Sequence, residues 1–179
     1  MNKLFASVLI GAATLTMASA AMAMTRASYN ATLDKATANY KMARNQCDSL
    51  SGNGKDVCVE EAKAVEKRAK AEAKAEYKHT TKAQTNALIA AADADYAVAK
   101  AKCGAKTGND MSVCVEEAKA AKTKAVAEAK ANKKVSDARV EARADTRAAD
   151  YKVAAQKCDA LAGAEKDSCV SAAKAKFGM

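Results

Sequence analysis

Three equally spaced pairs of cysteines constrain the fold of this chain more than any other feature. The spacing within each pair is the same, and successive pairs are offset by 56 and then by 55 along the sequence: Cys47, Cys58, Cys103, Cys114, Cys158 and Cys169. A tyrosine precedes the first cysteine of every pair at one fixed distance, at Tyr40, Tyr96 and Tyr151. Such self-similarity is typical of repeated supersecondary units. We therefore expect three hairpin repeats, at residues 24–80, 81–134 and 135–179, of which the third is shortened.

Apolar residues leading to each first cysteine recur at helical spacing. In the first repeat they step by four and three, as Tyr29, Leu33, Ala36, Tyr40, Ala43 and Cys47. Steps of three and four place side chains on one stripe of an α-helix. The composition agrees, because the 179 residues include no proline and 48 alanines, and alanine has the highest helix propensity. The cysteines are thus expected on the apolar seams of helices.

Between paired cysteines the helix must break. An unbroken helix would separate them by about 16 Å, whereas a disulfide needs Cα atoms within about 7 Å. Glycine and asparagine occur in these segments, at 51–54, 104–109 and 163. We expect glycine to end one helix in the left-handed conformation and asparagine or aspartate to cap the next. Each unit is then an αα-hairpin, stapled by the disulfide Cys47–Cys58, Cys103–Cys114 or Cys158–Cys169.

A zinc site is the competing interpretation of the cysteines. Structural zinc sites use about four ligands with short C-x₂₋₄-C spacing, and no such spacing occurs here. The single histidine, His79, lies outside every pair. We therefore favour disulfides and expect neither a metal site nor a cofactor.

The turns predict how the hairpins assemble. No glycine or proline occurs at 56–102 or at 112–157, so two very long helices are possible, unless they break at His79–Thr81 and Asn132–Ser136, where weak helix formers gather. Unbroken, they would place the first and third bends at one end and the second at the other. The predicted fold is all-α, an elongated antiparallel helical bundle built from three disulfide-stapled αα-hairpin repeats. A string of three loosely coupled hairpins is the alternative.

Residues 1–23 have the pattern of a secretory signal peptide. Lys3 precedes an uncharged apolar run, and both Ala18–Ala20 and Ala21–Ala23 fit the small-x-small cleavage pattern. We favour cleavage after Ala23 over cleavage after Ala20, and an N-terminal membrane anchor is the alternative. The expected mature chain has no transmembrane segment and is periplasmic or secreted, where thiols are oxidised.

Charge suggests one candidate binding segment. The chain carries 30 Lys+Arg against 21 Asp+Glu, mostly interleaved as on solvated helix faces. Within 119–134 a single acid, Glu128, accompanies the candidate polyanion-binding residues Lys119, Lys122, Lys124, Lys130, Lys133 and Lys134. For an exported chain, lipopolysaccharide phosphates or anionic lipids are the natural partners, with another envelope protein as the alternative. No nucleic acid is expected, since no aromatic stacking platform is present.

Enzymatic activity is not predicted. Catalysis needs a pocket with converging polar groups, whereas this chain has one histidine and no tryptophan. We interpret His79 as an exposed residue of a bend, and the three tyrosines as packing residues beside the disulfides. A thiol-redox or metal-buffering role is a further alternative, although C-x₁₀-C is not the C-x-x-C arrangement that tunes a thiolate.

The stretch Lys63–Lys78 resembles the Ala/Lys/Glu-rich helical region of TolA-type cell-envelope proteins, and Lys119–Lys134 is similar. The whole chain resembles small exported Ala/Lys-rich proteins of Gram-negative bacteria. The resemblance implies a place in the cell envelope. The chain departs from TolA in its paired cysteines, and in the retained anchor and C-terminal globular domain that we do not expect here. The expected function is a non-enzymatic structural, interaction or stress-protective role.

Overall fold

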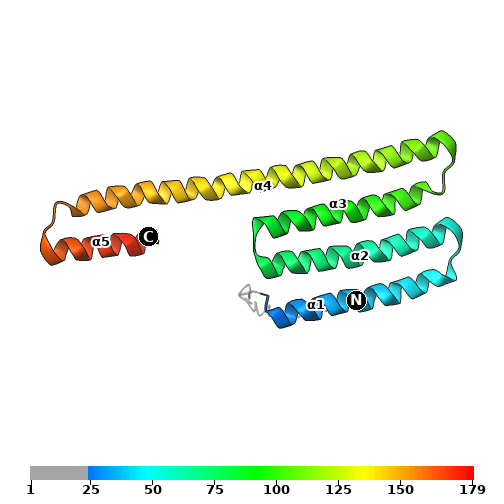
Figure 1. Ribbon diagram of the computed structural model, residues 1–179, viewed down its shortest axis with the longest axis horizontal. Helices are drawn as coiled ribbons and strands as arrows, with labels where there is room; N and C mark the ends of the chain where they lie inside the picture. The colour runs from blue at the N-terminus through cyan, green and yellow to red at the C-terminus, as the bar shows by residue number, and fades with distance from the viewer. Residues whose placement is uncertain (1–23) are drawn as a thin grey trace, which may run out of the picture.

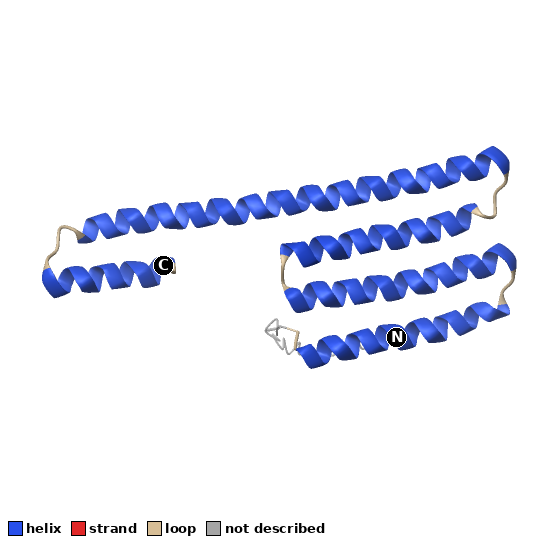
Figure 2. Cartoon of the chain, viewed as in Figure 1, coloured by secondary structure: helices blue, strands red, loops and turns tan. Residues whose placement is uncertain are grey.

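A row of antiparallel helices and one projecting hairpin make up the protein (Figure 1, Figure 2). The computed structural model describes residues 24–179, and within this range it contains helices and no strand. Each α-helix contacts only its neighbours along the chain. The elements are α1 (Arg26–Gln46), η1 (Cys47–Ser49), α2 (Gly52–Lys78), α3 (Thr81–Cys103), α4 (Gly108–Cys158) and α5 (Gly163–Phe177). The predicted all-α bundle of disulfide-linked hairpins is confirmed.

All three disulfides join the end of one helix to the second turn of the next. The paired Cα atoms are 5.6 Å apart in Cys47–Cys58, and 5.7 Å apart in both Cys103–Cys114 and Cys158–Cys169. The first cysteine of each pair is at most 1 % exposed, so the bridges fill the core at the bends. The predicted pairing is confirmed, and chain reversal at the intervening segments is what brings the sulfur atoms together.

The expected role of the glycines was wrong. Gly52, Gly108 and Gly163 adopt the left-handed conformation, with φ of 56° to 59°, but each is the first residue of a helix. The residues that cap the ends of α1, α3 and α4 are right-handed, and no asparagine or aspartate caps the helices that follow. A positive φ costs glycine nothing, so it lets the chain enter the second helix directly after a tight reversal.

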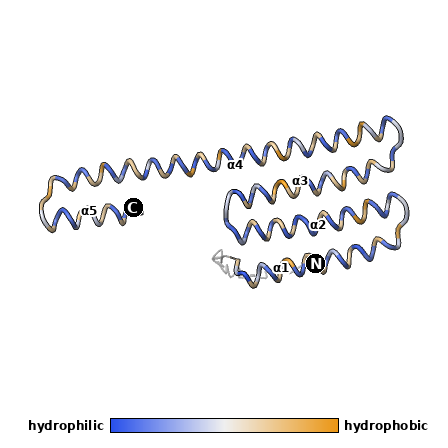
Figure 3. Tube along the Cα trace, in the orientation of Figure 1, coloured by the Kyte–Doolittle hydropathy of each residue, from blue (hydrophilic) through white to orange (hydrophobic). Residues whose placement is uncertain are grey.

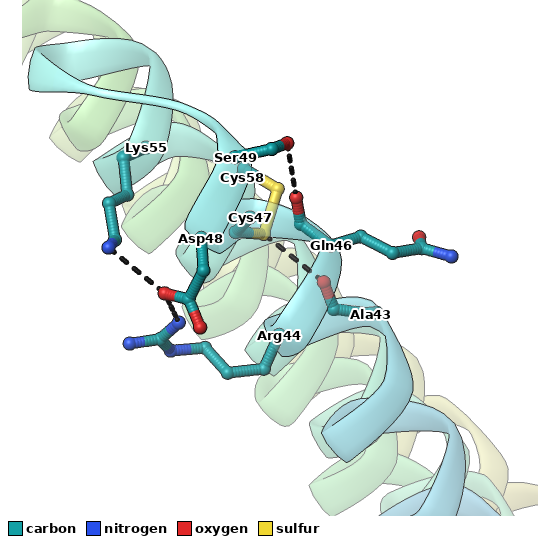
Figure 4. The surroundings of a disulfide bond; sticks show 8 residues. All are labelled: Ala43, Arg44, Gln46, Cys47, Asp48, Ser49, Lys55 and Cys58. Atoms are coloured by element: carbon teal, nitrogen blue, oxygen red, sulfur yellow. Dashed lines mark hydrogen bonds and ion pairs between the residues drawn. A yellow bond between two sulfur atoms is a disulfide. The ribbon is translucent and has the colours of Figure 1, made fainter.

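An ion-pair cluster crosses the first bend (Figure 4). The Asp48 carboxylate contacts Arg44 at 2.7 Å, from the end of α1, and Lys55 at 2.9 Å, from the start of α2. The third bend repeats half of this cluster with Lys166 and Asp159, 2.9 Å apart. These exposed pairs contribute little individually, and the disulfides remain the main constraint on each bend.

Of the two long helices that the sequence allowed, 56–102 is broken at His79–Thr81, one of the two possible breaks, and 112–157 is continuous. α2 ends at His79, which has φ 48°, and the Thr80 hydroxyl accepts a hydrogen bond from the backbone N–H of Ala83 to cap α3. No such break occurs at Asn132–Ser136, inside α4. The expected placement of the bends was therefore wrong. The first and second bends lie at one end of the row, and the third lies at the far end of α4 (Figure 1).

The core is thin because the helices form a single layer. Hydrophilic and hydrophobic residues alternate around every helix of the described chain (Figure 3). The buried residues are Ala36, Ala62, Ala64, Ala73, Ala92, Ala94, Ala118, Ala129, Ala173, Cys47, Cys103, Cys158 and Thr85. Alanine removes little apolar surface from water. Close helix approach and the cross-links must therefore compensate for the small hydrophobic contribution.

The predicted leader, its cleavage sites and the alternative anchor lie outside the described residues. Among the helices of residues 24–179, none has the length and hydropathy of a membrane-spanning helix. The three disulfides are compatible with an extracellular or periplasmic protein, because disulfides persist in oxidising compartments.

Candidate functional site

The predicted basic segment lies on α4, partly beside α3. Three of its six lysines are engaged in ion pairs. Lys122 reaches Asp93 of α3 at 2.8 Å, Lys119 lies 3.5 Å from Glu116 of its own helix, and Lys133 pairs with Asp137. These pairs reduce the positive charge that the segment presents to a ligand.

The remaining lysines do not form one compact patch. Lys124, Lys130 and Lys134 have no acidic partner within residues 24–179. At 3.6 residues per turn, Lys119, Lys130 and Lys134 share one flank of α4, over about 22 Å, whereas Lys124 lies on the other flank. The segment therefore offers a linear basic flank rather than the six-residue patch that the sequence suggested.

Asp93 of α3 forms ion pairs with both neighbouring helices, and sequence reasoning missed it. Its carboxylate contacts Lys122 of α4 at 2.8 Å and Lys67 of α2 at 3.5 Å. The Lys122 ammonium also lies 5.3 Å from the centre of the Tyr96 ring, a cation–π distance. Asp93 thus ties three helices together. In the sequence, an aspartate in an alanine-rich helix is expected to be solvated. Only the packing of α3 between α2 and α4 reveals this role.

This environment shifts the pKa values of both partners. The hydrogen bond to Lys122 holds the pKa of Asp93 below its usual range, with further help from the charge of Lys67. The same contact raises the pKa of Lys122. The lowered pKa of Asp93 means that its ion pairs stabilise the fold above the unfolded-state pKa, near 3.9, and that this contribution disappears as the pH falls through the folded-state pKa.

We expect Asp93→Asn to lower the melting temperature near neutral pH, because the amide cannot form these ion pairs. The difference from the wild type should shrink as the pH falls from about 5 toward 2, where the wild-type carboxylate is protonated as well. Thermal unfolding followed by circular dichroism measures it. Asp34→Asn is the control, since Asp34 is exposed and forms no ion pair within the described chain. An equal effect of both substitutions at every pH would contradict the bridging role.

The groove between α3 and α4 offers little chemistry. A hollow of about 260 Å³ is lined mainly by alanines, together with Asp95, Tyr96 and Lys122. The charged groups pair with neighbouring helices: Asp95 with Arg68, and Lys122 with Asp93. Their charges are thereby used in joining helices, and the groove is best explained as alanine packing.

The other predicted positions have structural surroundings. Tyr40, Tyr96 and Tyr151 are half-buried on their helices. His79 is exposed at the bend after α2, as expected, and its left-handed backbone ends the helix. Within the part of the chain that the structure describes, no three potential metal-binding side chains gather at one place.

The chain matches no protein-family model, no curated protein and no solved structure in the comparisons made with it.

Proposed function

We propose that this chain is an exported, non-enzymatic scaffold protein of the cell envelope, acting in the periplasm after removal of residues 1–23. The observation that carries the proposal is the geometry of α4. This helix has 51 residues, which corresponds to about 75 Å, and it links the four-helix row to the hairpin of α5. Residues 137–147 are all exposed. Such a helix holds two separate surfaces at a set distance from each other.

The disulfides support this role. They cross-link three of the four reversals of the described chain, α1–α2, α3–α4 and α4–α5, where a short helix or a thin alanine seam contributes little stability by itself. A cross-link of this loop size contributes about 3 kcal/mol in the chain-entropy model. The stapled hairpins would keep the scaffold folded in an oxidising compartment without a thick core.

Export and interaction need separate tests. For export, cell fractionation and mass spectrometry should find oxidised chains in the periplasm that begin at Met24, or at Ala21 for the earlier cleavage. Intact chains with reduced thiols in the cytoplasm would contradict the proposal.

For interaction, a photo-crosslinking residue at Val140, which is 60 % exposed, should capture an envelope component. The same residue at Lys35, exposed on α1, is the control, and equal labelling of both would argue against a specific surface.

A polyanion-binding function is the second candidate, favoured by the linear basic flank of Lys119, Lys130 and Lys134. We expect binding to vesicles of anionic phospholipid, weaker binding at high salt because the charges are exposed, and none to zwitterionic vesicles. The triple substitution of these lysines with glutamine should abolish the binding to anionic vesicles. A matched triple variant at Lys35, Lys152 and Lys174, all exposed, should bind as before. Equal loss in both variants would indicate only a net-charge effect.

A further inference from the structure

The side of α4 that points away from α3 and α5 carries a series of exposed small apolar residues (Figure 1). We call this series the outer face of α4; its members are Ala120, Ala127, Ala131, Ala142, Ala149 and Val153, all exposed. Ala120, Ala131, Ala142 and Val153 recur at every eleventh position, which is close to three helical turns. Ala118, buried against α3, is two positions from Ala120 and therefore on the opposite side.

The same residues form an interface elsewhere in this chain. Adding 56 to the residue number takes Cys58 of α2 to Cys114 of α4, and adding 55 takes Cys103 of α3 to Cys158. Under these shifts the outer face corresponds, without a single change of residue, to Ala64, Ala71 and Ala75 of α2 and to Ala87, Ala94 and Val98 of α3. These six are buried or half-buried, and α2 packs against α3. The outer face thus carries six residues of the α2–α3 interface, three from each half, whereas Ala90 of that interface corresponds to Asp145.

Two of the three ion pairs of that interface have oppositely charged equivalents on α4. Arg68 pairs with Asp95, and Glu61 lies 2.9 Å from Lys102. Their equivalents on α4 are Lys124 with Asp150, and Glu117 with Lys157. All four equivalents are exposed, and none forms an ion pair within the described chain. The third pair, Lys67–Asp93, has no counterpart, because Thr123 and Ala148 occupy those positions.

One chain cannot readily bring its own two halves together. Between α2 and α3 the reversal uses the left-handed His79 and the capping Thr80. The equivalent segment of α4 is Lys134-Val135-Ser136. It is one residue shorter than the reversal between α2 and α3, since the shift drops from 56 before it to 55 after it. Val135 is β-branched, and a positive φ is a severe strain for such a residue. α4 accordingly runs straight through this point, so the two halves remain on one helix.

We infer that the outer face of α4 binds a second copy of this chain in an antiparallel two-fold dimer. Lys124 then meets Asp150 of the other copy, and Glu117 meets Lys157. Both pairs have numbers that sum to 274, so one antiparallel register, centred near Asp137, satisfies both. Symmetry doubles each contact, and the interface extends over about 60 Å of helix. The α3 and α5 helices lie on the far sides of the pair and do not obstruct it.

This inference goes beyond the proposed scaffold role and does not depend on it, because self-association is measured on purified, oxidised protein. Sedimentation equilibrium of the mature chain, from micromolar to submillimolar concentration, reports the mass regardless of molecular shape. We expect the mass to rise toward that of a dimer. A monomer mass throughout would overturn the inference, including the case of a monomer that folds α4 back on itself.

Two charge-reversal variants test the register. Lys124→Asp places aspartate opposite Asp150 of the other copy, and Asp150→Lys places lysine opposite Lys124. Each variant alone should dimerise at least tenfold more weakly than the wild type. An equimolar mixture should recover dimers, because both contacts of the mixed dimer join opposite charges: one is the wild-type pair and the other is the same pair with its charges exchanged. Only pairing between chains gives this recovery.

The control is Lys35→Asp, at an exposed position on α1 that forms no ion pair within residues 24–179. Its dimerisation should match that of the wild type, and circular dichroism should show equal helix content in all variants. The inference would be overturned if the single charge-reversal variants dimerised as strongly as the wild type, or if their mixture formed no more dimer than each variant alone. Either result would show that another face mediates association.

Discussion

Removing the third disulfide with Cys158→Ser and Cys169→Ser should unfold α5 while the four-helix row persists. α5 has 15 residues and contacts only α4. Isolated helices of this length are marginal in water, and Ala173 is its only buried residue. Loss of the cross-link costs about 3 kcal/mol in the chain-entropy model, which is more than this contact can replace. Far-ultraviolet circular dichroism should lose the helical signal of α5, and amide exchange in α5 should become fast.

The matched control is Cys47→Ser with Cys58→Ser. α1 is longer, at 21 residues, and packs along α2. At the end remote from the disulfide, the rings of Tyr29 and Tyr77 stack with centroids 4.8 Å apart. We expect this variant to melt at a lower temperature but to keep α1 helical at room temperature. If the Cys158/Cys169 variant kept its full helical signal and slow exchange in α5, the disulfide would not be what holds that hairpin.

Enlarging Ala94 should produce the second large effect, a loss of global stability. Asp93 and Asp95 on either side of it both reach α2, through Lys67 and Arg68. Ala94 therefore faces α2 squarely, and it is 2 % exposed. Leucine at this position has no room unless the helices separate, and overpacking of this kind costs about 1–3 kcal/mol. For Ala94→Leu we expect the melting temperature to fall by several degrees.

Ala38→Leu is the control for this effect, because Ala38 is exposed on α1. Surface substitutions away from special features usually change stability by less than about 0.5 kcal/mol. Thermal unfolding of oxidised protein measures both variants. Equal melting temperatures would show that α2 and α3 are not packed through Ala94, and would also weaken the comparison of this interface with the outer face of α4.

Much of the local structure was predictable because its signals are local. The spacing of Cys47 and Cys58 exceeds what a disulfide can span along a helix, so it requires a reversal in any fold. The location of the glycines gave the position of each reversal but not its geometry. Gly52 begins a helix rather than ending one. A glycine in the sequence is compatible with both positions, and only the backbone conformation of the neighbouring residues distinguishes them.

The candidate binding residues were less predictable. The lysines of 119–134 show how charge is distributed along the sequence. The charge that a ligand can reach depends on the acidic residues of neighbouring helices as well. Lys122 is taken up by Asp93 of α3, and Lys124 lies on a different flank from Lys130. Neither Asp93 nor the equivalence between the α2–α3 interface and the outer face of α4 could be identified before the helix contacts were known.

The sequence by itself determined the helices, the three reversals and the disulfide pairing, because each depends on residues fewer than about a dozen positions apart. Only the tertiary structure decided that the chain reverses after His79 yet continues straight through Val135. The second place is one position shorter and has Val135 where the first has His79, and a β-branched residue is strained in the left-handed conformation that ends α2. This difference places two bends together, leaves the third at the end of a long helix, and exposes the outer face of α4.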